Sequence, residues 1–423
     1  MWIEWVNHAS FIVESASVRL ICDPWLSGTA FNQGWSLLSP TKLKPEEFDR
    51  ITHIWFSHEH PDHFSPQNLR NIPEAIRRNI KVLFQRTDDK RVIGACRHLG
   101  FKTDELPAGK VVFLAPDFSV LCGTLRPVDS WLSICAEGKT LLNMNDCVFK
   151  SEGRLQAIKH RVGKIDVLLT QFSYANWVGN PDDALSHLKH AKQKLDEIAR
   201  QVRLFEPAQF VPFASFIVFA HKENSFMNQA ANRIGDVFEY AERTLNVGTV
   251  VLYPGDRWKV GASRDSGNSM QRYDDDFWRA LKRDPIESSS VELPLLKRAA
   301  ATYFRQCDHK NNRLLLRAMA PARIRLKDLE INLELSFRKG LVHKNASQHD
   351  IAMSSDSLLY CLNWDWGAET LAINGRYEVP KSGKPSRFFR IFQVGRHNAV
   401  GTNVDLSFLG YQVIQKAKEV AQL

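Results

Sequence analysis

The chain has 423 residues, 44% of them apolar and 24% charged, with a formal net charge of +9, which indicates a globular protein of two or three domains. Its longest strongly apolar run, 210–220, is about half of what a bilayer crossing needs, and no basic and apolar signal-peptide pattern opens it. The seven cysteines form no C-x-x-C pair, which argues against a disulfide framework or a Cys-ligated metal. These features predict a soluble cytoplasmic protein with no membrane partner.

Short apolar segments between turns predict strands in the first part of the chain, at 2–6, 10–15, 18–25 and 53–57. The segment 130–146, with two apolar runs around the turn EGK, predicts a hairpin.

Helical periodicity appears at 67–76 and again at 182–202. In the second helix, with Asn180 as its candidate cap, the predicted apolar stripe is Leu185, Leu188, Leu195, Ile198 and Val202. Further strands are expected at 164–172 and 249–256.

The polar segment 259–276 has the composition of a linker, and the pattern changes after it. We therefore expect a catalytic domain at 1–258 and a smaller C-terminal α/β domain at 277–423.

Three histidines and an aspartate lie close together in HEHPDH, where His58, His60, Asp62 and His63 follow a predicted strand. Imidazole and carboxylate groups are suitable ligands for zinc, iron or manganese, and a loop fixed to a strand end can hold them in place. The alternative is a polar surface loop rich in histidine. The spacing favours a metal site.

These residues, with NHASF (7–11) and DPWL (23–26), resemble the metallo-β-lactamase superfamily. The resemblance implies an αββα sandwich, with two metal ions at one edge of the sheets. It assigns His58 and His60 to the first ion and Asp62 and His63 to the second, with Asp146 bridging both. His221 is the best match for the last ligand; its alternative role is packing at a strand end.

The sequence departs from the usual hydrolase pattern of this superfamily at Asp129, which stands where those hydrolases place a histidine. An additional carboxylate makes the site more anionic, which suits oxidised iron and resembles the di-iron oxygenases of this fold. The alternative is that Asp129 lies outside the ligand shell and leaves an open coordination position.

Residues 1–256 also resemble CMP-N-acetylneuraminate hydroxylases, in DPWLSGTAFNQGW, QFSYANWVGNP and PFASFIVFAHKEN. Those enzymes carry a Rieske domain, but here no C-x-x-H follows any C-x-H, so the sequence has no matching cluster motif. Electrons for an oxygenation would then come from a partner protein or from the substrate. The resemblance supports the fold and the site, and not sialic acid as the substrate.

The C-terminal region contains SSDSLLYCLNWDWGAETLAINGRYE, which resembles sterol-carrier-like α/β modules. A helix, a turn and a strand are expected there, and the domain either shapes the substrate pocket or mediates formation of a homodimer. The aromatic and basic segment 386–398 is interpreted as strand core and not as a nucleic-acid site, and no segment concentrates charge as a nucleic-acid-binding tail would.

Two chemistries follow from this sequence. In the favoured one, two iron ions support oxygenation of a small polar or anionic substrate. In the other, zinc or manganese ions make water a nucleophile near neutral pH, Asp146 orients it, and an ester, lactone, amide or phosphodiester is hydrolysed.

Overall fold

The computed structural model describes residues 1–15, 17–125, 129–149, 151–345 and 348–406. The chain forms two compact units. The first unit comprises 1–175, 184–219 and 227–284, and the second unit comprises 176–183, 220–226 and 285–423. Among the helices of the described ranges, none is both long enough and apolar enough to span a bilayer.

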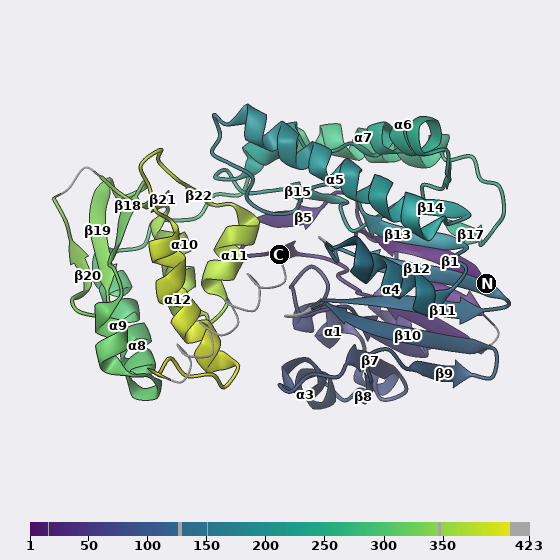
Figure 1. Ribbon diagram of the computed structural model, residues 1–423, viewed down its shortest axis with the longest axis horizontal. Helices are drawn as coiled ribbons and strands as arrows, with labels where there is room; N and C mark the ends of the chain where they lie inside the picture. The colour runs from purple at the N-terminus through teal and green to yellow at the C-terminus, as the bar shows by residue number, and fades with distance from the viewer. Residues whose placement is uncertain (16, 126–128, 150, 346–347, 407–423) are drawn as a thin grey trace. The chain divides into compact units, whose positions relative to one another are not determined.

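Two seven-stranded sheets form the first unit (Figure 1). In sheet order, the strands of the first sheet are β17 (Arg257–Lys259), β1 (Trp2–Asn7), β2 (Ser10–Ser15), β3 (Val18–Cys22), β6 (His53–Phe56), β7 (Lys81–Gln85) and β8 (Lys102–Leu106). Those of the second sheet are β16 (Gly248–Thr249), β14 (Gln209–Phe213), β13 (Val167–Gln171), β12 (Lys139–Asn145), β11 (Asp129–Ala136), β10 (Phe118–Leu125) and β9 (Val111–Ala115). A small third sheet contains β15 (Ile217–Phe219), β5 (Trp35–Leu37) and β4 (Thr29–Ala30).

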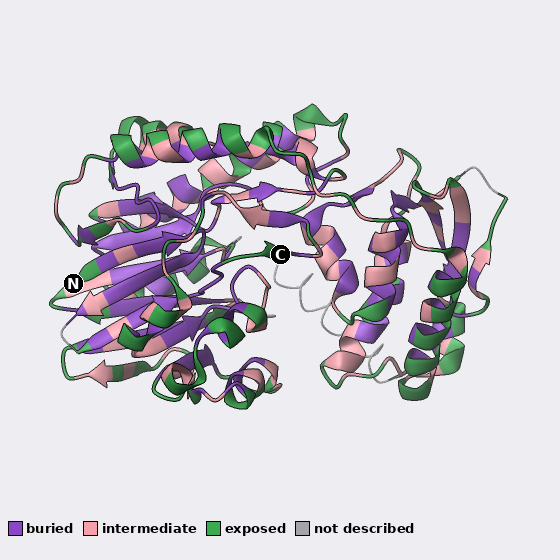
Figure 2. Cartoon of the chain, turned by 180° about the vertical axis from the view of Figure 1, so that it is seen from behind, coloured by how far each residue is buried: buried purple, intermediate pink, exposed green. Residues whose placement is uncertain are grey.

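Side chains alternate between the two faces of the first sheet, and both faces are buried. In β2, Phe11 and Val13 join the core shared with the second sheet, whereas Ile12 packs in a separate core with residues of the outer helices. This period of two is what a strand covered on both faces requires. The strands are accordingly mostly buried in Figure 2.

Helices cover the outer faces of both sheets. Beside the first sheet, α3 contacts β7 and β8; beside the second, α5 contacts β13 and α4 (Figure 1). The helical elements of this unit are η1 (Pro45–Arg50), α1 (Pro66–Asn71), α2 (Glu74–Arg77), α3 (Arg91–His98), α4 (Glu152–Val162), α5 (Ala184–Phe205), α6 (Ile234–Tyr240), η3 (Ala241–Leu245) and α7 (Gly267–Leu281), while η2 (Ser225–Gln229) crosses from the second unit into the first. The layers confirm the predicted αββα sandwich.

The predicted strands, hairpin and long helix of the first unit are present, with four differences. The segment 249–256, predicted as a strand, is strand only at Thr249, the last residue of β16. The segment 67–76 forms two short helices, because Pro73 follows the end of α1. Leu185 and Leu188, expected in the apolar stripe of α5, are 82% and 58% exposed. The segment 259–276, predicted as a linker, belongs to the first unit, where it includes the last residue of β17 and the start of α7.

The second unit is built on a five-stranded sheet, in the order β20 (Gly340–His343), β19 (Ile331–Ser336), β18 (Ala322–Leu326), β21 (Ile351–Met353) and β22 (Tyr377–Glu378). Its helices are α8 (Leu293–Lys310), α9 (Arg313–Ala318), α10 (Ser355–Asn363), α11 (Gly367–Asn374) and α12 (Ser386–Ala399). The expected α/β character and the helix at α10 are confirmed.

Two segments of the second unit differ from the prediction. The expected strand after the turn WGAE is mostly α11, and the expected strand at 386–398 is α12. Phe388, Ile391 and Phe392 are nevertheless buried, so the interpretation as core is confirmed although the element is a helix. Asn180, predicted to cap α5, instead belongs to this unit and exchanges side-chain hydrogen bonds with the backbone of Val379.

Candidate metal centre

The candidate site lies in the first unit, where several loops leave the ends of strands. Within the first sheet, β3 and β6 run parallel, so their carboxyl ends lie at the same edge. Asp23 follows β3, the HEHPDH loop follows β6, and Asp146 follows β12 of the second sheet. His8 occupies the tight turn between β1 and β2.

The histidines of the loop face one another closely. Nε2 of His58 lies 2.8 Å from Nδ1 of His60, and the rings of His58 and His63 are 4.2 Å apart between centroids. His58 and His63 are buried, whereas His60 is half-buried. Burial and the neighbouring His58 lower the pKa of His60 to about 4, which keeps its imidazole neutral and able to bind a metal.

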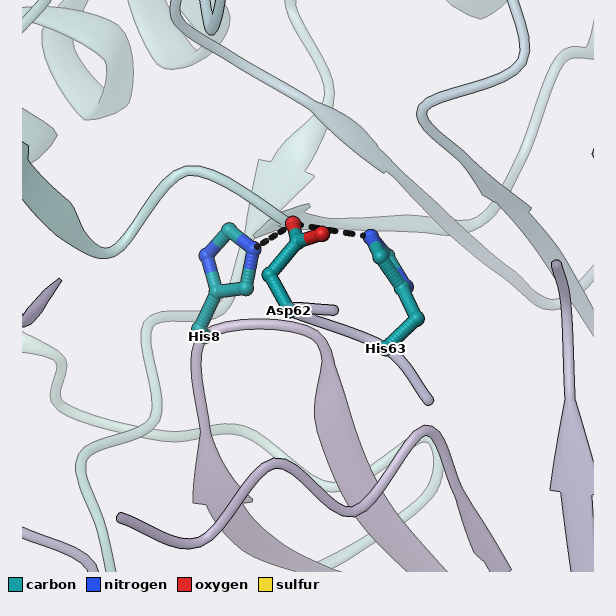
Figure 3. Close-up of side chains that lie close together, drawn as sticks. All are labelled: His8, Asp62 and His63. Atoms are coloured by element: carbon teal, nitrogen blue, oxygen red, sulfur yellow. Dashed lines mark hydrogen bonds and ion pairs between the residues drawn. The ribbon is translucent and has the colours of Figure 1, made fainter. Parts of the chain in front are cut away.

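Asp62 lies between two imidazoles, as Figure 3 shows. Its Oδ2 is 3.2 Å from Nε2 of His63 and 3.2 Å from Nε2 of His8. Burial raises the pKa of Asp62, but the charge and hydrogen bond of His63 outweigh this effect and lower it well below its usual range. The carboxylate is therefore charged in a buried position.

Asp23 fixes the position of the HEHPDH loop through hydrogen bonds. Its Oδ1 accepts the Ser57 backbone N–H at 2.8 Å, and its Oδ2 accepts the Ser57 hydroxyl at 2.7 Å and Nδ2 of Asn145 at 2.7 Å. Nδ1 of His63 lies 3.1 Å from the same Oδ2. A hydrogen bond at Nδ1 leaves Nε2 of His63 directed toward Asp62 and Asp146, which is the usual way a carboxylate orients a metal-binding histidine.

Asp146 faces two of these histidines. Its Oδ2 is 3.6 Å from Nε2 of His58 and 3.7 Å from Nε2 of His63. The positive φ of Asn145, 52°, turns the chain at the end of β12 immediately before this residue.

Asp129 begins β11 and is half-buried. Burial and repulsion from the charge of Asp146 raise the pKa of Asp129 to about 6.

Among the residues that the structure describes, two groups of ligand atoms are compact enough to hold a cation, with all atoms of each group within 4.8 Å of one another. One contains His8, Asp62 and His63, and the other contains His58, His63 and Asp146. Within the described ranges, Oδ1 of Asp62 and Oδ1 of Asp146 are buried and lack a hydrogen-bond partner. Because a buried carboxylate oxygen without a partner is costly, these atoms fit a bound metal ion.

His221 belongs to the second unit. Its Nδ1 accepts the Glu223 backbone N–H at 3.2 Å, and its Nε2 lies 3.1 Å from Oγ of Ser288. Burial and the Arg376 charge lower its pKa to about 4. Both ring nitrogens contact groups of that unit, and its role as a metal ligand stays a prediction.

Sequence reasoning did not assign a role to His8, Asp23 or Asn145. His8 and Asp23 lie in NHASF and DPWL, the two segments on which the family resemblance rests. The available signal was that both are polar residues at the ends of predicted strands. Their contacts with the loop could not be predicted, because those contacts depend on strands that are far apart in sequence.

Residues 2–115 match the family model described as beta-lactamase superfamily domain. The cytidine monophosphate-N-acetylneuraminic acid hydroxylase of Danio rerio is 24% identical over 356 residues, covering 75% of this chain and 58% of the relative. A putative Rieske 2Fe-2S iron-sulfur protein of Mycolicibacterium smegmatis is 27% identical over 201 residues, covering 45% and 38%. The chain thus spans less than two thirds of the length of these relatives.

Solved structures give weaker similarities. CmlA, a diiron beta-hydroxylase from Streptomyces venezuelae, is 14% identical with a TM-score of 0.41, covering 61% of this chain and 54% of that one. A possible metal-dependent hydrolase from Veillonella parvula is also 14% identical, with a TM-score of 0.44, covering 61% and 98%. Residues 2–115, which match this family model, lie in the first unit, whose two sheets carry helices on their outer faces.

Proposed function

We propose that the first unit is a dinuclear-metal enzyme, and that its reaction is the oxygenation of a small polar or anionic substrate by a non-haem di-iron centre. The observation that carries the dinuclear site is the pair of His and Asp groups that share His63, each with a buried carboxylate oxygen that has no partner within the described ranges.

The proposed ligands follow the sequence pattern. Within the first unit, His58, His60 and Asp129 would hold one ion; Asp62 and His63 would hold the other; and Asp146 would bridge both. Iron bound in this way would supply the redox chemistry that activates dioxygen.

The protein side chains have separate tasks in this proposal. Asp23 and Ser57 fix the loop, and His8 orients Asp62 through its hydrogen bond. His60, Asp129 and Asp146 are only partly buried, so substrate would approach from their side. His8 and His63 are buried on either side of Asp62 and exclude water from its carboxylate.

Support for oxygenation comes from Asp129, whose carboxylate increases the negative charge of the site, and from the Danio rerio relative, which is named as a hydroxylase. Hydroxylation of a C–H bond by dioxygen consumes two electrons and two protons, and the second oxygen atom leaves as water. The electrons would come from a partner protein or from the substrate. A Rieske protein is the kind of donor that the Mycolicibacterium relative suggests.

Hydrolysis is the second candidate, because the group His58, His63 and Asp146 would also suit zinc. With zinc or manganese bound, the centre would activate water, and Asp146 would orient it toward an ester, lactone, amide or phosphodiester.

The two candidates can be separated without a known substrate. The full chain is reconstituted with equal amounts of Fe(II), Zn(II) and Mn(II), and the retained metals are measured anaerobically and after exposure to air, with spectroscopy for coupled ferric ions. Retained iron that consumes oxygen when reduced supports oxygenation. Exclusive retention of zinc, with no oxygen uptake by the iron-loaded protein, would overturn it in favour of hydrolysis.

A further inference from the structure

A pocket in the first unit lies against β10, β11 and α4, and no residue of the HEHPDH loop lines it. Its volume is about 440 Å³, within the usual range for small-molecule sites. Helix α4 contributes Arg154, Ala157, Ile158 and Arg161 to its lining. The spacing i, i+3, i+4 and i+7 places these four on one helix face, with the two arginines two turns apart.

The two arginines of this pocket, Arg154 and Arg161, are exposed to solvent on the surface of α4. Across the described ranges, neither Arg154 nor Arg161 has an ion pair or a hydrogen bond, and the lining contains no carboxylate. The rest of the lining is largely apolar, including Leu125, Trp131 and Phe149. Two guanidinium groups beside an apolar wall are a suitable arrangement for an anion that also carries an apolar body.

Two glycines make room for the side chains that shape the pocket. A Cβ atom on Gly123 would lie 2.1 Å from ring atoms of Trp131, and a Cβ atom on Gly109 would lie 1.9 Å from Nη1 of Arg161. Any larger residue would displace the indole or the guanidinium. The missing side chains of Gly123, in β10, and of Gly109, between β8 and β9, therefore leave the space that the indole and the guanidinium occupy.

The pocket adjoins the strand pair that carries Asp129. Leu125 in β10, which lines the pocket, is the register partner of Asp129 in β11. Gly123 and Trp131 are the partners one step further along the same face. A molecule bound here would thus contact the strands that position a predicted metal ligand.

We propose that this pocket binds a small organic anion, with its phosphonate, phosphate or carboxylate group on Arg154 and Arg161 and its apolar part against Trp131 and Phe149. This site goes beyond the proposed oxygenation, because binding here requires neither a metal nor a reaction.

The test is calorimetric titration of the full chain with phenylphosphonate, before and after removal of metal by a chelator. Saturable binding is expected in both forms. Arg154→Gln and Arg161→Gln should each weaken it about tenfold or more, since a hydrogen bond between charged groups is lost. Inorganic phosphate, which lacks the apolar part, and benzyl alcohol, which lacks the charge, should each bind at least tenfold more weakly.

The matched control is Lys159→Gln, which removes one positive charge from the same helix but outside the lining. It should leave the affinity within about twofold. Absence of saturable binding, equal weakening by the control, or binding lost with the metal would each overturn the proposal. The last result would place the anion on the metal centre, and binding that persists without metal would leave this site standing even if the proposed oxygenation failed.

Discussion

Replacing Asp23 by asparagine should disturb the metal centre from outside its ligand shell. Asp23 is fully buried, and its Oδ2 faces the Ser57 hydroxyl, Nδ2 of Asn145 and Nδ1 of His63. In Asp23→Asn, the amide oxygen can still accept the Ser57 backbone N–H, but the amide nitrogen would face Asn145 and His63 as a donor against donors. At least two charge-assisted hydrogen bonds are lost.

The expected magnitude follows from these two contacts. Each hydrogen bond to a charged group contributes about 1.5–3 kcal/mol, so the free energy of unfolding should fall by about 3–6 kcal/mol. His63 would also lose the contact that orients its ring, and metal affinity should fall about 10- to 100-fold.

Chelator-competition titrations with Zn(II) and Fe(II), together with urea unfolding of the metal-free protein, measure both effects. Asp350→Asn is the matched control, because Asp350 is equally buried but is bound by Arg323 in the second unit. The control should lower stability and leave metal affinity unchanged. If Asp23→Asn bound both metals as tightly as the wild type, Asp23 would not orient the site.

Three further outcomes are expected. His8→Leu, which has no hydrogen-bond donor, should weaken metal binding about tenfold in the same titrations, because Asp62 loses a hydrogen bond, whereas His53→Leu, in β6 and outside the site, should not. Equal affinities of the two variants would contradict this. Asp129→His should shift metal preference from iron toward zinc and abolish oxygen consumption, and unchanged relative affinities would move Asp129 out of the ligand shell. Burial raises the pKa of Asp350, but the hydrogen bonds from Arg323 outweigh burial and lower the pKa of this carboxylate in the folded protein. The contribution of Asp350 to the free energy of unfolding is therefore fully present above the ordinary pKa of 3.8, and it is lost as the pH falls through the lower pKa of the folded state. Acid unfolding curves of wild type and Asp350→Asn should therefore converge as pH falls below 3.8, and a constant difference would refute this assignment.

Much of the first unit could be predicted because its strands have strong local signals. The short apolar run of β2 and the turn at Glu137 and Gly138 are visible in the sequence and recur in the structure. The C-terminal region was harder, because the aromatic residues of α12 suit either a strand or a buried helix face. Only tertiary packing decides between them.

The candidate metal centre was likewise only partly predictable from the sequence. The HEHPDH loop is a local motif, so four of its side chains could be identified by spacing alone. His8 and Asp23 reach the loop across other strands, and their contacts depend on the parallel pairing of β3 with β6 and on the turn after β1. Sequence patterns carry little information about such long-range pairing.

The number of metal ions bound per chain tests the dinuclear centre most directly. The measurement is elemental analysis of the full chain after reconstitution with iron, zinc and manganese and removal of unbound metal, with circular dichroism to verify folding. The wild type should retain close to two ions, and His63→Ala should retain at most one while remaining folded, because His63 is a proposed ligand of the second ion. A wild-type chain that retains no metal, or a His63→Ala chain that retains as much as the wild type, would contradict the proposed centre.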